Sequence, residues 1–391
     1  MNRATNPAKQ DQSALRFIRN VAAKALALYI LANLIFAAGY PMDALGKVSG
    51  YNLIFPSRQR LPYGDKPERA YNLSLYNLEA MFASQEISNG PKPANEYRII
   101  LIGDSSTWGF LLTPGQTLAA YISAAGLKMP DGRNVKAYNL GYPVMSLTKD
   151  LLILSYALRY QPDLIIWPVT LESFPYDKQL FPPILQNNPQ PVRNLIQTYH
   201  LNLDPQSSDL VKTTYWDRTI LGARRPLADL IRLQLYGVLW AATGIDQDIP
   251  TTYTPPMEDL PADESFHNLQ PPQLSPSDLA LDVLEAGISM AGNTPVLLIN
   301  EPMFISQGKN SQIRYNFYYP RWAYDQYRQI MLETSAEKGW HYLDMWDLIP
   351  GSEFTNSAVH LTPTGSQEFA QAILEAVQEL NSTASGKAAG K

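Results

Sequence analysis

The chain of 391 residues contains no cysteine and only four histidines. Without cysteine it can form no disulfide, no thiolate nucleophile and no cysteine-ligated zinc or iron–sulfur site. Four histidines also provide little material for a histidine-rich metal centre. We therefore expect neither a metal nor another cofactor.

The sequence also lacks an excess of positive charge, because 31 Lys and Arg stand against 36 Asp and Glu. Binding to nucleic acid requires a basic face, so we expect no nucleic-acid partner. Hydrophobic residues make up 45% of the chain and charged residues 17%, which is typical of a globular protein. The 31 prolines, against 22 glycines, predict long irregular connections.

One long apolar run is present, from Val21 to Tyr40, and as a helix it would be about 30 Å long, matching a bilayer. Lys24 lies in its first turn and can snorkel to the headgroups. We expect 1–20 to be a cytoplasmic tail and 21–40 a single-pass anchor in the cell membrane, with the main domain extracytoplasmic. This orientation follows from the basic residues before the run, Arg3, Lys9, Arg16 and Arg19. A cleaved signal peptide and a buried core helix remain alternatives.

Strands and helices alternate in the rest of the chain, which predicts an α/β domain. The fold class that we expect is a doubly wound, flavodoxin-like parallel sheet of about five strands, with its ligand site at the carboxyl ends of the strands. The predicted strands are Arg98–Ile102, Val135–Leu140, Leu164–Trp167, Pro295–Asn300 and Trp340–Met345. The main predicted helices are Leu147–Tyr160, Ser275–Ala291, Arg321–Lys338 and Ser366–Leu380.

The domain is divided by a segment rich in Pro, Gln, Asn and Asp, 175–274, which we interpret as a large cap insertion or lid. It separates a first half, 97–174, from a second half, 275–380. The other expected segments are a connector, 41–96, and a disordered polar tail, 381–391. Within the insertion, Pro226–Thr243 predicts a helix that packs on the core or lies on the membrane surface beside Arg224, Arg225 and Arg232.

A candidate nucleophile follows the first predicted strand directly. Ser105, preceded by Asp104, stands where a strand-to-helix turn would expose it at the carboxyl edge of the sheet. A serine hydroxyl needs a base to remove its proton, and His360, in the sequence SAVHLTPTG, follows the last predicted strand at the same edge. We predict Ser105 as the nucleophile and His360 as its base.

The segments RIILIGDSSTWGF, YNLGYPVMS and HLTPTG resemble the conserved blocks of the SGNH/GDSL hydrolase superfamily, over about Tyr97 to Leu380 without the insertion. The resemblance implies a serine esterase or acyltransferase with oxyanion donors at Ser105 and Gly141. An anchored, outward domain of this kind is similar to the D-alanyl transfer protein of lipoteichoic acid synthesis and to exopolysaccharide O-acetylation proteins. That similarity implies a glycan or lipid substrate of the cell envelope and a membrane-bound O-acyltransferase as partner.

Two blocks depart from the family pattern. In LIIWPVTLESF the family's Gly and Asn have no counterpart, and Thr170 or a backbone N–H would have to replace the oxyanion donor. Three residues before His360, where the family has Asp, stands Ser357, preceded by Asn356. Neither can stabilise an imidazolium by charge, although either can accept a hydrogen bond from it. The departures leave open a dyad with a weak orienting group, a triad with an acid from elsewhere, and a catalytically silent scaffold that binds glycan or a membrane partner.

Further candidates surround the same edge. Asn300 and Glu301 end a predicted strand there, so both are candidate substrate contacts, and Glu301 is also a candidate to orient His360. A structural carboxylate at a strand end is an equally good interpretation of Glu301. Trp108, in the first block, is a third candidate substrate contact.

Overall fold

The centre of the structure, a computed structural model that describes residues 7–64 and 66–389, is a parallel sheet in the order β2-β1-β3-β4-β5. This is the doubly wound, flavodoxin-like order predicted from the sequence, and every strand lies within a residue or two of its predicted position. The strands are β1 (Glu96–Leu101), β2 (Asn134–Asn139), β3 (Leu164–Val169), β4 (Val296–Asn300) and β5 (His341–Asp344).

Both faces of the sheet are covered by helices, so the strands are apolar at consecutive positions rather than at alternate ones. On β1, Ile99 and Leu101 pack with α5 and α12, whereas Ile100 packs into the larger core on the other face. That larger core includes side chains from α3, α6, α10 and α11. The helices named here are α3 (Leu78–Ser84), α5 (Leu118–Ala124), α6 (Leu147–Ala157), α10 (Leu281–Ala291), α11 (Arg321–Lys338) and α12 (Pro363–Ala389).

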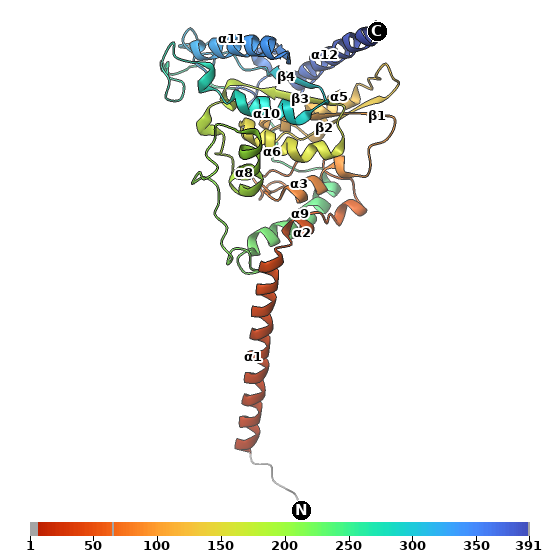
Figure 1. Cartoon of the computed structure of the whole chain (residues 1–391), viewed down its shortest axis with the longest axis vertical. Helices are drawn as coiled ribbons and strands as arrows, with labels where there is room; N and C mark the ends of the chain where they lie inside the picture. The colour runs from red at the N-terminus through yellow and green to blue at the C-terminus, as the bar shows by residue number, and fades with distance from the viewer. Residues whose placement is uncertain (1–6, 65, 390–391) are drawn as a thin grey trace, which may run out of the picture.

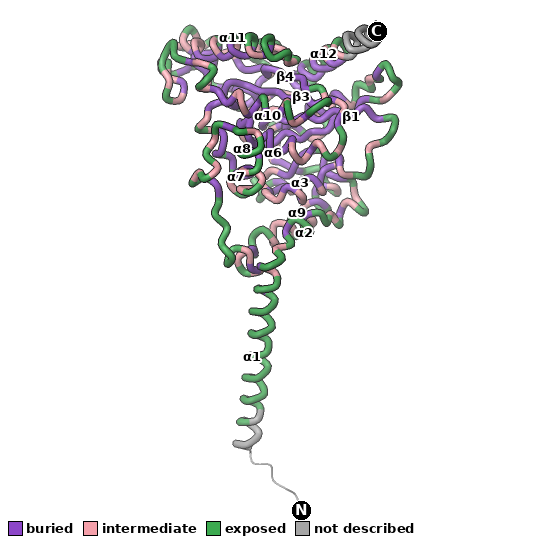
Figure 2. Tube along the Cα trace, in the orientation of Figure 1, coloured by how far each residue is buried: buried purple, intermediate pink, exposed green. Residues whose placement is uncertain are grey.

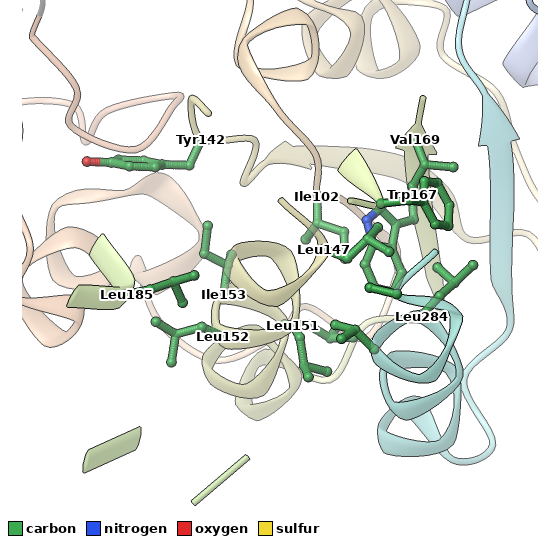
Figure 3. Packing of buried hydrophobic residues seen from close by; sticks show 14 of the residues in the cluster. Ile102, Tyr142, Leu147, Leu151, Leu152, Ile153, Trp167, Val169, Leu185 and Leu284 are labelled. Atoms are coloured by element: carbon green, nitrogen blue, oxygen red, sulfur yellow. The ribbon is translucent and has the colours of Figure 1, made fainter. Parts of the chain in front are cut away.

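Trp167 of β3 is the largest apolar side chain between the sheet and the helices α6 and α10 (Figure 3). A Cβ at Gly287 of α10 would lie 2.4 Å from the Trp167 ring, so only glycine allows this close approach. The buried indole N–H donates to Asp150 of α6 over 3.1 Å. The sheet and α6 are thereby joined by a polar contact as well as by packing.

Helix α1 (Pro7–Gly39) projects away from the domain, and from Ala14 to Ala32 it is exposed, whereas Asn33 and Ala37 near its end are buried (Figures 1 and 2). Its segment Ala14–Gly39 is long and apolar enough to cross a membrane, and only 11% of its most apolar window is buried. A core helix would be mostly buried, so that alternative interpretation is wrong. Residues 1–6 of the expected cytoplasmic tail lie outside the described residues.

The insertion 175–274 does not form a single lid. Its helices α7 (Pro183–Gln186) and α8 (Pro189–Tyr199) contact α6, and α9 (Arg224–Thr243) lies beside α2 (Met42–Gly46) near the end of α1 (Figure 1). Its last part runs along the carboxyl edge of the sheet, where His267 contacts Glu172. The insertion therefore reaches both the segment that follows β3 and the end of α1.

The connector is fixed to the domain by Arg60, which is 2% exposed. Its guanidinium forms a two-point ion pair with Asp246, at distances of 2.7 and 2.5 Å, and donates to the carbonyls of Gly109 and Leu112. It also lies over the ring of Trp108, 4.2 Å from the ring centre. One buried cation thus joins the connector, the insertion and the turn that follows Ser105.

At the carboxyl end of the chain, the structure differs from the sequence-based expectation. Helix α12 continues to Ala389, into the segment 381–391 that we predicted to be disordered. This segment contains no proline, so nothing in the backbone forces the helix to stop. Gly390 and Lys391 lie outside the described residues.

Candidate active site

Ser105 is the first residue of the short helix α4 (Ser105–Trp108), which follows β1 after a sharp turn. Gly103 has a φ of 151°, a region that other residues rarely adopt, and a Cβ there would lie 2.5 Å from Thr107 Oγ1. Asp104 caps the helix by accepting from the Ser106 N–H over 2.8 Å. The turn places the half-buried Ser105 hydroxyl at the carboxyl edge of the sheet.

His360 reaches this hydroxyl from the other end of the domain sequence. Ser105 Oγ lies 2.8 Å from His360 Nε2, within the range required of a nucleophile and its base. The ring of Phe110 packs against the imidazole with 4.8 Å between ring centres. The structure therefore brings together the two residues that the sequence nominates, across 255 positions of the chain.

The orienting group is Asn356, whose Oδ1 lies 3.0 Å from His360 Nδ1. An amide oxygen can only accept, so this contact requires the proton on Nδ1 and leaves the Nε2 lone pair directed at Ser105. Ser357, at the family's acid position, is buried and hydrogen-bonds with Tyr318 instead. The Ser357 alternative is therefore wrong, and the three side chains form a Ser–His–Asn arrangement.

The electrostatic setting of His360 favours the free base. Burial lowers the pKa of His360 from 6.5 to about 4, because a charged imidazolium would lose its solvation. The neutral Asn356 supplies no charge to oppose this effect. His360 is thus ready to accept a proton at neutral pH.

The oxyanion donors differ from the sequence-based expectation. The Gly141 N–H donates to Asn139 Oδ1 over 3.0 Å, so it is already engaged. The Thr170 hydroxyl is fully buried and donates to the Tyr319 hydroxyl over 3.0 Å. Both assignments are therefore corrected, since each donor has another partner. The Ser105 N–H fits the role better, because the first N–H of a helix has no acceptor within it.

Directly behind Ser105 lies a buried pair of acids, Asp104 and Glu301, which are 5% and 1% exposed. Ser106 Oγ donates to Glu301 Oε2 over 2.6 Å, whereas Asp104 Oδ2 and Glu301 Oε1 are buried without a hydrogen-bond partner. Burial and the charge of Asp104 raise the pKa of Glu301 well above its ordinary value. The raised pKa favours the protonated form of Glu301, whose O–H can donate to Asp104. The contacts of Glu301 are those of a structural carboxylate, because it is 1% exposed and bonds to Ser106 rather than to His360.

Lys149 and Asp150, in the first turns of α6, were not predicted as part of this region. The Lys149 ammonium is fully buried, donates to the carbonyls of Gly103 and Tyr142 over 2.6 Å, and pairs with Asp150 over 2.6 Å. It therefore fixes the turn that precedes Ser105. Two adjacent charges at the start of an otherwise apolar helix, LTKDLLILSYALRY, are the signal that could have identified them.

Two more candidates prove to be structural. Asn300 is fully buried, donates to Asp344 over 2.8 Å and accepts from the Tyr324 hydroxyl over 3.0 Å. Trp108 is 1% exposed, and its indole N–H donates to the Leu61 carbonyl over 2.8 Å. Neither side chain can touch a substrate, because burial and its partners occupy it fully. Asp104 likewise acts as a helix cap and a buried charge rather than as a catalytic acid.

No protein-family model and no curated protein matches the sequence. Similar solved structures include a protein from Agrobacterium tumefaciens assigned as an arylesterase, at 13% identity, 72% of this chain, 98% of that chain and a TM-score of 0.30. A carbohydrate acetylesterase family member from Sinorhizobium meliloti is 13% identical, covers 73% of this chain and 99% of its own, and has a TM-score of 0.31. The α/β hydrolase LAE5, from the metagenome of Lake Arreo, Spain, is 13% identical, covers 72% of this chain and 94% of its own, and has a TM-score of 0.31. At such values these likenesses carry no argument about activity.

The chemistry of the site is that of an activated serine. His360 can take the Ser105 proton at Nε2 as Oγ attacks a carbonyl carbon, and Asn356 holds the imidazole in the required tautomer. The cluster behind Ser105 holds the turn rigidly without touching the reacting atoms. These contacts help to keep Ser105 within hydrogen-bond distance of His360.

Proposed function

We propose that the protein is a serine esterase or O-acyltransferase that works through an acyl-Ser105 intermediate. Ser105 Oγ attacks the ester carbonyl while His360 Nε2 takes the hydroxyl proton. His360 then gives this proton to the departing alkoxide, which leaves as an alcohol. Water or an acceptor hydroxyl, deprotonated by His360, attacks the acyl group and regenerates Ser105. The observation that carries the proposal is the 2.8 Å contact of Ser105 Oγ with His360 Nε2.

We further propose that the substrate is a glycan or lipid of the cell envelope, with α1 as the anchor. The exposed, apolar helix α1 supports the anchor, because Ala14–Gly39 is long enough to cross the hydrocarbon core of a bilayer. The resemblance of the GDSS and HLTPTG segments to SGNH hydrolases supports ester chemistry. The arrangement of anchor and outward domain fits a membrane-bound O-acyltransferase as the source or acceptor of the acyl group.

The decisive experiment is labelling of the purified, full-length protein with a fluorophosphonate probe, which reacts only with an activated serine. We expect labelling of the native chain and none of Ser105→Ala or His360→Ala. Ser106→Ala is the matched control, because Ser106 is the adjacent hydroxyl but bonds to Glu301 rather than to His360. Its labelling should persist.

A catalytically silent scaffold that binds glycan is the second candidate. It is favoured by the neutral Asn356 and by the engaged Gly141 N–H, both of which weaken a hydrolase site. No labelling of the folded native protein would favour this candidate and refute the first.

A further inference from the structure

Helix α9 presents an apolar face to the outside of the molecule. Ile231, Leu235, Val238 and Leu239 are 63, 60, 38 and 41% exposed, and their spacing of three and four places them on one side of the helix. Helices of soluble proteins normally turn such a stripe toward the core. This stripe faces away from the core, so it needs another partner.

The opposite side of α9 is the one that packs on the domain. Leu233, Gly237 and Trp240 are buried there, and a Cβ at Gly237 would lie 2.4 Å from the ring of Tyr51. Gln234 also accepts from the Gly50 N–H over 2.6 Å. The helix is therefore firmly seated, and its outward orientation is fixed by contacts with the connector.

A positively charged hollow lies at the beginning of the same helix. Its volume is about 670 Å³, and its charged lining residues are Arg224, Arg225, Arg232 and Asp229. Asp229 pairs with Arg232 over 2.9 Å and neutralises part of the charge. Two guanidinium groups remain in excess, beside the apolar stripe. Basic residues next to an apolar face are typical of helices that lie at a membrane surface.

The segment that leads into α9 contacts the end of α1. In the segment before α9, the Tyr215 hydroxyl donates to the Leu34 carbonyl over 3.1 Å, and the Leu221 N–H donates to Asn33 Oδ1 over 3.1 Å. The segments α2 and Tyr51–Leu53, which contact α9, also carry exposed apolar side chains, among them Leu45 and Leu53. Exposed apolar side chains and the contacts with α1 therefore lie on the same segments, α9 and the chain next to it.

We propose that the outward face of α9 lies in the surface of the lipid bilayer, with Arg224, Arg225 and Arg232 contacting anionic phosphate headgroups. This inference rests on the proposed role of α1 as a membrane anchor. The apolar stripe supplies the buried area, and the arginines supply the attraction to negative lipids. The domain would then rest on the membrane instead of hanging from a single helix.

The test uses the absence of cysteine, which makes any introduced cysteine unique. The full chain carrying Leu235→Cys is labelled with a nitroxide and reconstituted in lipid discs that contain phosphatidylglycerol. Collision with oxygen, which enters lipid, is compared with collision with a water-soluble nickel chelate. We expect the label at position 235 to collide more often with oxygen than with the chelate. Leu332→Cys is the matched control, an exposed leucine on α11, for which the chelate should dominate.

Leu28→Cys, in α1, separates the two proposals. If the label at 28 lies in lipid while the label at 235 is as accessible to the chelate as the label at 332, the anchor stands and the docking of α9 is refuted. Protection at 235 only in native membranes, and not in lipid discs, would indicate a protein partner and also overturn the proposal. Immersion should deepen when phosphatidylglycerol replaces part of the phosphatidylcholine, and no dependence would refute the headgroup contact.

Discussion

Asn356 occupies the position of a triad aspartate beside His360 but is uncharged. Its amide oxygen fixes the tautomer of His360, but it carries no charge to stabilise the imidazolium that forms when Ser105 loses its proton. The contact thus orients the His360 ring but does not stabilise its positive charge. A carboxylate at this position would supply both.

We therefore expect Asn356→Asp to raise kcat/KM for ester hydrolysis by at least about tenfold, since the reverse change in a triad protease costs about 10⁴-fold. The new carboxylate should also raise the pKa of His360 and move the acid limb of the pH–rate profile to higher pH. The pH profile of kcat/KM measures both effects. Asn356→Ala should lower the rate, and equal rates for all three chains would mean that Asn356 does not orient His360.

The pKa of His360, lowered to about 4 by burial, determines the pH range of the native protein. Only the neutral imidazole acts as a base, so activity should persist through weakly acidic pH and fall as the pH drops through about 4. Between pH 6.5 and about 4 the unfolded chain binds a proton at His360 that the folded chain does not, so the free energy of unfolding should decrease as pH falls. A rate profile with its acid limb near pH 6.5 would contradict this prediction.

Glu301 should tolerate replacement by glutamine, because its raised pKa favours the neutral form that glutamine imitates. A glutamine amide can donate to Asp104, and its oxygen can accept from Ser106, as Glu301 does. We expect Glu301→Gln to react with the fluorophosphonate probe at nearly the native rate, whereas Glu301→Ala should be less stable because it leaves Asp104 without its donor.

The pH dependence of unfolding provides the second measurement for Glu301. Above pH 4.5 the folded protein retains a proton that the unfolded glutamate has lost, so the native chain loses stability as pH rises. Glutamine removes this dependence. A variant whose unfolding midpoint still falls with pH as steeply as that of the native chain would show that Glu301 is ionised.

At the level of single residues, the sequence identifies Ser105 and His360 because each follows a recognisable strand at the same sheet edge. It could not decide between Asn356 and Ser357, since the choice depends on how one short loop is folded. That loop is closed by the Thr355 N–H, which donates to the His360 carbonyl over 2.8 Å. The burial of Trp108 and Asn300 likewise depends on partners that are far away in the sequence, such as Arg60 and Tyr324.

At the level of elements, strands and long helices were predictable because each is apolar over its whole length or on one face. The position of the insertion was not, because its segments are held by single long-range contacts rather than by periodic patterns. The ion pair of Arg60 with Asp246 is one of these, joining residues 186 positions apart. Nothing in the local sequence marks either partner as buried.

We expect Asp246→Asn to lower the free energy of unfolding by about 3–5 kcal/mol, because it leaves the buried Arg60 without its counter-charge. The matched control is Asp248→Asn, two residues away, whose partners Lys66 and Arg69 are half exposed or more, so that its loss should cost at most about 1 kcal/mol. Urea unfolding of the full chains in detergent measures the difference. Equal midpoints would show that the buried pair contributes little.

At the level of the whole molecule, a long exposed apolar helix carries a domain with a serine site. If α1 is an uncleaved anchor, the native chain should remain in the membrane pellet after extraction with high salt and with alkaline carbonate, since neither removes a spanning helix. Removal of residues 1–39 should reduce this retention. Release of the native chain by alkali, or a mature N-terminus beyond Gly39, would show that the helix is a signal peptide.

The loop before α9 grips the last turns of α1 through Asn33 and Leu34, and Arg218 lies over the ring of Tyr40, 5.2 Å from its centre. If a flexible linker joined α1 to the domain, the domain could rotate freely relative to α1. Because these contacts join α1 to the domain, a rotation imposed on α1 would turn the whole domain with it. A membrane protein that binds the side of α1 would thereby set the direction in which Ser105 faces, without touching the domain itself.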